Sequence, residues 1–149
     1  MPTVEKVART DAGLAAELRT SVMRLRRRLA SEVDPGNDLS IPMMAVLGLL
    51  LRRGEATVGE LATAERIQPP TMTRKVKALE EGGYVARRPH DTDGRQVVIA
   101  LTDLGREVVL RDRRRRDEWL ARALRDLAPA EREALRVAVP LLHRLSEHD

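Results

Sequence analysis

The residues that could do chemistry are mostly basic, and the first group of them lies in the segment 69–82. Placed on a helix at about 100° per residue, this segment puts Met72, Val76 and Leu79 on one side, which predicts the buried face. The opposite side carries Pro70, Arg74, Lys77 and, at the C-terminal end, Glu81, and its flanks carry Thr71 and Thr73. No acidic residue occurs between positions 68 and 79. A face of short polar and basic side chains is suited to binding an anion.

This arrangement suits the major groove of duplex DNA. A helix N-terminus carries positive dipole charge and free N–H groups that favour phosphate. Short hydroxyls allow close approach, and Arg or Lys side chains reach guanine O6 and N7. We therefore predict that DNA is contacted by Pro70, Thr71, Thr73, Arg74 and Lys77. The alternative is an amphipathic surface helix whose basic face is only solvated.

The second basic segment, RRPHDTDGRQVVIALT at 87–102, predicts a β-hairpin. Alternation within 97–101 indicates a half-buried strand whose odd-numbered positions share the buried face. Asp93 and Gly94 suit a turn with positive φ. Arg95 follows the tip, where it can enter a narrow and strongly electronegative minor groove. We therefore predict that Arg95 contacts DNA from the hairpin.

Five other polar residues of the hairpin have predicted roles. Carboxylates are unfavourable beside phosphate, so we expect Asp91 and Asp93 to orient Arg95, or the arginine of the helix, through a bidentate charge-assisted bond. Arg87, Arg88 and His90 are expected to contact the DNA backbone. The alternative is a surface hairpin whose tip pairs with itself.

The sequence does not indicate an enzyme. No Ser or Thr lies beside a His in a nucleophile motif, no glycine-rich phosphate loop occurs, and no carboxylate pair is isolated from arginines. The chain has no Cys, which excludes disulfides and thiolate zinc sites. His90, His143 and His148 are too scattered to indicate a metal site. We expect no catalysis, no cofactor and no metal.

Length and composition indicate a single domain. The chain has 149 residues, with no Phe, one Trp and one Tyr, so its core must be aliphatic. The formal net charge of +4 supports nucleic-acid binding only weakly. No apolar run approaches the ~20 residues that span a bilayer, and the N-terminus lacks the apolar region of a signal peptide. We expect a cytoplasmic protein without a membrane segment.

The elements that must position these side chains are mostly helical. Apolar periodicity and capping residues predict a series of helices and one hairpin at 84–101. The predicted helices lie at about 12–33, 41–53, 57–64, 69–82, 103–127 and from 129 onward. This order indicates a mainly α fold with a small β-hairpin, in which about 41–102 form a winged helix-turn-helix lobe. The helices in 10–34 and 103–147 carry apolar stripes that require partners.

The chain resembles the MarR family of bacterial winged-helix transcription regulators over about residues 12–147. The resemblance is carried by the run SIPMMAVLGLLLRRGEATVGELATAERIQPPTMTRKVKALEEGGYVARRPHDTDGRQVVIALTDLGRE. Its most specific pieces, PPTMTRKVKALEEGGYV and DTDGRQVVIALTDLG, are similar to the recognition helix and the wing of that family. PPTMTR with DGRQ resembles an actinobacterial branch. The resemblance implies one MarR-type domain over 1–149, with a DNA-binding lobe and a helical dimerisation lobe.

The resemblance also implies a function. It implies a cytoplasmic homodimer that represses transcription from a pseudo-palindromic operator in double-stranded DNA. Its DNA contacts would fall on Thr71, Thr73, Arg74, Lys77 and Arg95. The first and last helices of two chains would bury the stripes of Leu14, Leu18, Val22, Leu135, Val139 and Leu142. Packing of these stripes within one chain is the alternative.

The wing of this chain departs from the family pattern. The wing of the family has an Asp followed by two adjacent arginines, whereas Asp93 is followed here by Gly94 and Arg95, so one arginine is missing.

The resemblance also implies a small anionic or aromatic effector bound between the lobes. The candidate pocket residues are Met23, Arg26, Met43, Met44 and Leu47. Methionines at helical spacing are also ordinary core residues.

A winged-helix module that binds RNA or another protein is the alternative function. Single-stranded RNA would require stacking aromatic residues, and the sequence has almost none. The acid-free face at 70–77 favours duplex DNA.

Overall fold

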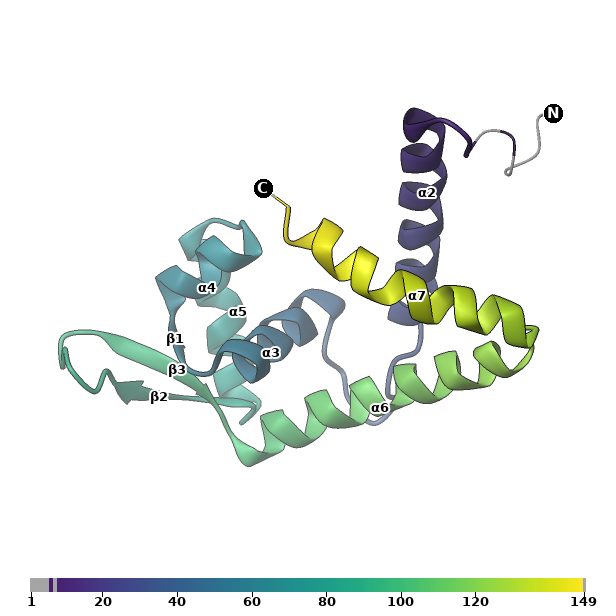
Figure 1. Cartoon of the computed structure of the whole chain (residues 1–149). Coiled ribbons are helices and arrows are strands. Elements are labelled where there is room, and N and C mark those ends of the chain that lie inside the picture. Colours follow the sequence, from purple (N-terminus) through teal and green to yellow (C-terminus); the bar gives the residue numbers. More distant parts are fainter. Residues whose placement is uncertain (1–5, 7, 149) are drawn as a thin grey trace. The chain divides into compact units, whose positions relative to one another are not determined.

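The computed structural model describes residues 6 and 8–148. The chain divides into two compact units, seen in Figure 1. We call residues 33–114 the sheet unit, and residues 1–32 with 115–149 the helical unit. The elements are α2 (Asp11–Ala30), α3 (Ile41–Arg53), β1 (Ala56–Thr57), α4 (Val58–Glu65), α5 (Pro69–Glu81), β2 (Val85–Pro89), β3 (Val97–Leu101), α6 (Asp103–Arg125) and α7 (Pro129–Ser146). The predicted mainly helical fold with a small antiparallel sheet is confirmed.

Helix α3 is the central helix of the sheet unit. Ser40 caps its start by accepting a hydrogen bond from the Met43 amide at 3.4 Å. Gly54 ends it with φ +83, a conformation that favours glycine. Val46 and Leu47 are fully buried in the core. The apolar sequence of this helix therefore predicted both its boundaries and its central place.

Helices α4 and α5 form a helix-turn-helix. The hydroxyl of Thr57 caps α4 by accepting the Glu60 amide at 3.1 Å, as the capping pattern predicts. The helix ends at Arg66, whose φ of 54° and ψ of 43° are left-handed. Among the described residues, Arg66 is the non-glycine residue with positive φ. This left-handed residue turns the chain sharply enough for α5 to begin at Pro69.

The sheet has three strands, one more than the sequence predicts. The order is β1-β3-β2 and both pairings are antiparallel. The added strand β1 places Ala56 opposite Ile99 and Thr57 opposite Val98. Two residues are too few to show the alternation by which a strand is recognised in a sequence. Only their pairing with β3 makes them a strand.

Thr102 fixes the junction between the hairpin and α6. Its hydroxyl donates to the carbonyl of Gly83 at 2.6 Å and accepts the amide of Gly105 at 3.1 Å. The first half of α6 then packs on the sheet unit, where Val109 joins the hydrophobic core. For this reason the sheet unit extends beyond the predicted 41–102 lobe.

In the helical unit, α2 contacts the last turns of α6. The Arg28 guanidinium lies 4.2 Å from the centroid of the Trp119 ring, within cation–π range. The Nε of Arg116 donates to the carbonyl of Leu29 at 3.2 Å. Helix α2 ends earlier than predicted because Ser31 turns its hydroxyl back to the carbonyl of Arg28 at 2.7 Å. No helix within 6 and 8–148 is long and apolar enough to cross a membrane.

Candidate nucleic-acid interface

Helix α5 presents the polar face that its sequence predicts. Met72, Val76 and Leu79 are fully buried in the core of the sheet unit. Burial of these three side chains turns the opposite side of the helix outward. On that side Thr71 is half-buried, whereas the exposed residues are Pro70, Thr73, Arg74 and Lys77. The exposed side has no acid in its first turn.

The N-terminus of α5 differs from the expectation of free N–H groups. Pro69 and Pro70 occupy the first two helical positions and have no N–H to offer. The amide of Thr71 donates to the carbonyl of Gln68 at 3.0 Å. What the first turn can offer to an anion is therefore its dipole and its side chains, and not unpaired amides. The two prolines in the sequence already carried this information.

The hairpin of β2 and β3 projects beyond α4 and α5 in Figure 1. Five residue pairs hold the two strands together, from Val85 opposite Leu101 to Pro89 opposite Val97. Val97 is 45% exposed, whereas Val98 and Ile99 are both buried. The predicted alternation is therefore wrong at Val97, because that residue lies next to the tip and beyond the core.

The tip is closed by Asp93. Its carbonyl accepts the Gln96 amide at 3.0 Å, and its carboxylate accepts the Arg95 amide at 3.1 Å. Gly94 has no positive φ, which corrects the expected turn. The carboxylate of Asp93 stabilises a turn that requires no left-handed residue. Asp93 therefore contacts the backbone of Arg95 and not its guanidinium. The side chain of Arg95 is exposed to solvent.

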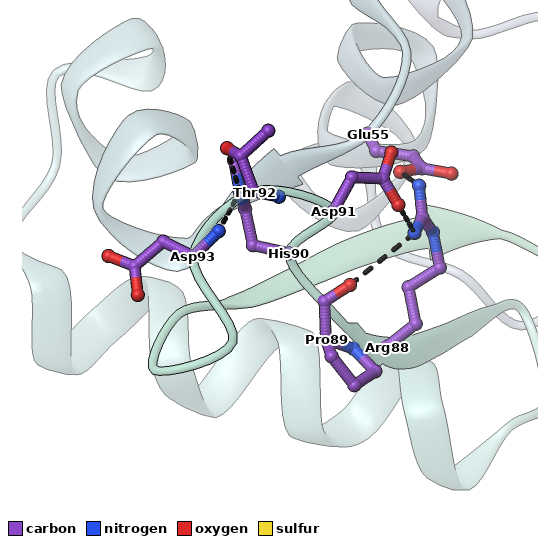
Figure 2. A network of polar contacts seen from close by, with 7 residues as sticks. All are labelled: Glu55, Arg88, Pro89, His90, Asp91, Thr92 and Asp93. Carbon is purple, nitrogen blue, oxygen red and sulfur yellow. Dashed lines mark hydrogen bonds and ion pairs between the residues drawn. The ribbon is translucent and has the colours of Figure 1, made fainter.

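His90 closes the tip from its other side. Its Nδ1 accepts the amides of Thr92 and Asp93, each at 3.2 Å (Figure 2). One ring nitrogen of this predicted DNA contact is therefore occupied within the tip.

Arg88 is held between two carboxylates, as Figure 2 shows. One is Glu55, which precedes β1, and the other is Asp91, whose Oδ1 lies 2.9 Å from Nη1 of Arg88. The hydrogen bond from Arg88, reinforced by its charge, lowers the pKa of Asp91 below its ordinary value. The expected pairing of Asp91 with Arg95 or Arg74 is therefore wrong. Asp91 lies three residues from Arg88, which brings the two side chains together locally.

The neighbouring Arg87 pairs with Glu80 of α5. Successive residues of a strand point to opposite faces, so the two arginines leave β2 in opposite directions. Glu55 and Glu80 were not predicted as site residues. Glu80 lies within the run PPTMTRKVKALEEGGYV, but nothing in that run marks it as the partner of Arg87.

The predicted apolar stripes lie on the helical unit. Leu18 is half-buried, whereas Leu14, Val22, Leu135, Val139 and Leu142 are 38–50% exposed. Neither α2 nor α7 contains a buried residue. Packing within the chain therefore leaves most of each stripe open.

The candidate effector residues are divided between the two units. Met23 and Arg26 are exposed on α2. Met43 and Met44 pack against the core of the sheet unit, and Leu47 is fully buried in it. Leu47 is therefore a core residue in this structure. Within the described part of the chain, no group of three His, Asp or Glu residues could hold a metal ion.

Comparisons with known proteins agree on one family. The family model described as "MarR family" matches residues 39–97. An HTH-type transcriptional regulator of Mycobacterium tuberculosis (strain CDC 1551 / Oshkosh) is 42% identical over 89% of this chain and 92% of its own.

Solved structures share the fold. A MarR family protein from Bacillus stearothermophilus has a TM-score of 0.80 and 26% identity, covering 94% of this chain and 97% of its own. A MepR mutant of S. aureus bound to an oligodeoxyribonucleotide has a TM-score of 0.65 and 20% identity, covering 90% of this chain and 96% of its own. The second likeness, at this identity, shows the fold alone.

Proposed function

The chain belongs to the MarR family of transcriptional regulators with a DNA-binding helix-turn-helix, and on that premise we propose that it is a homodimeric repressor of a pseudo-palindromic operator. In this proposal α5 enters the major groove, and the hairpin of β2 and β3, the wing, reaches the adjacent minor groove. The homodimer resides in the cytoplasm and uses neither catalysis nor a cofactor.

The observation that carries the proposal is the exposed face of α5. Arg74 and Lys77 extend from it with the hydroxyl of Thr73 beside them, and no carboxylate interrupts its first turns. Arg and Lys read guanine by donating to O6 and N7. A face of this length, free of acids and held rigidly by a buried opposite side, fits a groove lined with acceptors. Arg95 adds an exposed cation from the wing.

The open stripes of α2 and α7 support the homodimer. A monomer that left these aliphatic residues in water would lose the free energy of their burial, about 25 cal/mol per Å². A second copy offers the same apolar surface across a two-fold axis. Such a dimer would place two α5 helices about 34–36 Å apart, one helical turn of DNA.

A small anionic or aromatic effector completes the proposal. Arg26 and Met23, both exposed on α2, would supply a cation and an apolar contact for it. The other candidate residues, Met43 and Met44, are only half-buried on α3 of the sheet unit.

The test is quantitative footprinting of the purified protein on genomic DNA, followed by salt titration on the bound duplex. Operator binding should weaken steeply with salt, because each neutralised phosphate contributes about 0.9 to the log–log slope. Arg74→Ala should cost roughly 1–3 kcal/mol on the operator and little on unrelated duplex, since it removes a base contact.

Arg122→Ala is the matched control, because it removes an exposed arginine from the helical unit. A flat salt dependence would refute duplex binding and favour the protein-interaction or RNA-binding alternative. An unchanged operator affinity in Arg74→Ala would remove Arg74 from the interface.

A further inference from the structure

The two consecutive arginines of β2 each join the wing to a different element. Arg87 pairs through Nε with Glu80 of α5 at 2.5 Å. Arg88 pairs with Glu55, which lies between α3 and β1, and with Asp91 of the tip. Neither guanidinium is free, although both side chains remain about 40% exposed. In the described part of the chain, the guanidinium of Arg95 makes no such pair.

Arg88 lies where the sheet narrows from three strands to two, so its pair with Glu55 can hold the base of the wing in place. Arg88 lies opposite Val98, and Val98 lies opposite Thr57 of β1. This is the last level of the sheet at which all three strands are present. Beyond it, the wing is held only by the pairing of β2 with β3. The bond from Arg88 to Glu55 therefore spans the central strand β3, from β2 to the start of β1, at the base of the free part of the wing (Figure 2).

Arg87 acts at the other side of the strand. The chain between α5 and β2 is short and contains Gly83 with φ +78. A link through glycine resists rotation weakly. The ion pair with Glu80 ties β2 directly to the last turn of α5, which sets the strand against the helix.

We infer that Arg87 and Arg88 are positioning residues that set the wing relative to the recognition helix, and that Arg95 is the cation that the wing offers to DNA. The inference rests on the proposed function. A guanidinium whose N–H groups already donate to carboxylates, one for Arg87 and two for Arg88, has fewer of them to offer to phosphate. This role replaces the predicted backbone contacts of Arg87 and Arg88.

The two roles of Arg88 predict opposite effects when Glu55 loses its charge. If Arg88 contacted phosphate, Glu55→Gln would free it and tighten binding. If Arg88 positions the wing, Glu55→Gln loosens the wing and weakens operator binding, by roughly three- to tenfold for a contact that acts through another residue. Asp91→Asn should act in the same direction. Asp91 is exposed at the tip, so this second variant leaves the fold intact.

A double-mutant cycle with Arg95→Ala identifies the residue through which Arg88 acts. Arg88→Gln should weaken binding in the wild-type background and have little further effect when Arg95 is already Ala. Arg88→Lys keeps the positive charge but lacks the planar guanidinium that donates to two carboxylates at once. It should therefore weaken binding as Arg88→Gln does. Glu81→Gln is the control, because it removes an equal charge from the exposed end of α5 without touching either pair.

Operator affinity is measured well below the melting temperature of each variant, which is recorded alongside. Weaker binding in Glu55→Gln and Asp91→Asn, with a non-additive cycle, supports the inference. Tighter or unchanged binding in both variants, or an additive cycle, overturns it while leaving duplex binding intact. Failure of the wild-type protein to bind any duplex overturns the proposed function itself.

Discussion

Asp91 Oδ1 lies 2.9 Å from Nη1 of Arg88, so the tip of the wing is tied by charge to the strand that carries it. The hydrogen bond and the charge of Arg88 lower the pKa of the Asp91 carboxyl below its ordinary 3.8. A carboxyl whose folded pKa is lowered adds stability above its unfolded pKa and loses it as pH falls through the folded value. The ion pair between Arg88 and Asp91 should therefore persist at neutral pH and be lost only in acid, when the carboxyl is protonated.

The first prediction concerns this carboxyl. An NMR titration should give Asp91 a pKa below 3.8, and Arg88→Gln should raise it towards that ordinary value. Glu81→Gln, which removes a charge from neither pair, is the control variant for this titration. An Asp91 pKa that does not respond to Arg88→Gln would show that the pair is absent in solution.

Gly94 offers a place for the arginine that the family pattern has and this chain lacks. A Cβ there would meet no atom within 4 Å, and the residue has no positive φ. Gly94→Arg should therefore fold normally and add a second cation at the tip. We expect tighter duplex binding and a log–log salt slope steeper by about 0.9 per bound chain. Gly94→Ala should change neither quantity, and an unaltered slope in Gly94→Arg would place the tip away from phosphate.

Gly105 packs against the backbone at the start of α6. A Cβ there would lie 2.0 Å from the carbonyl oxygen of Tyr84, a contact that requires the backbone to move. Gly105→Ala should destabilise the protein by about 1–3 kcal/mol, the usual cost of overpacking. Urea denaturation measures the change, with Gly94→Ala as a control in open space. Equal stability of the two variants would contradict this packing.

Val139 tests the proposed dimer. It is 49% exposed on the stripe of α7, whereas Val137 is 62% exposed about 200° away around the same helix. Val139→Glu should place a charge in the apolar interface and convert the dimer to monomers, whereas Val137→Glu should not. Sedimentation velocity distinguishes the two, and operator affinity should fall with the dimer. A Val139→Glu protein that remains dimeric would exclude this face from the interface.

Much of the sheet unit was predictable because its signals are local. The caps at Ser40 and Thr57 and the buried face of Met72, Val76 and Leu79 depend on residues within one turn of each other. Helical periodicity therefore located α5 and turned its polar face outward without knowledge of the rest of the fold. The two prolines at its start also determined, by lacking N–H groups, that its first turn offers few free amides.

The tertiary structure decided which charges remain available. The sequence has the same residue type at positions 87, 88 and 95. In the structure, however, Arg87 pairs with Glu80 and Arg88 pairs with Glu55. These partners come from α5 and from the loop before β1, and only chain folding brings them within bonding distance. The two-residue strand β1 likewise exists only because β3 pairs with it. Local patterns determine helices, caps and faces, whereas the pair of Arg88 with Glu55 and the edge strand β1 depend on residues that are distant in the chain.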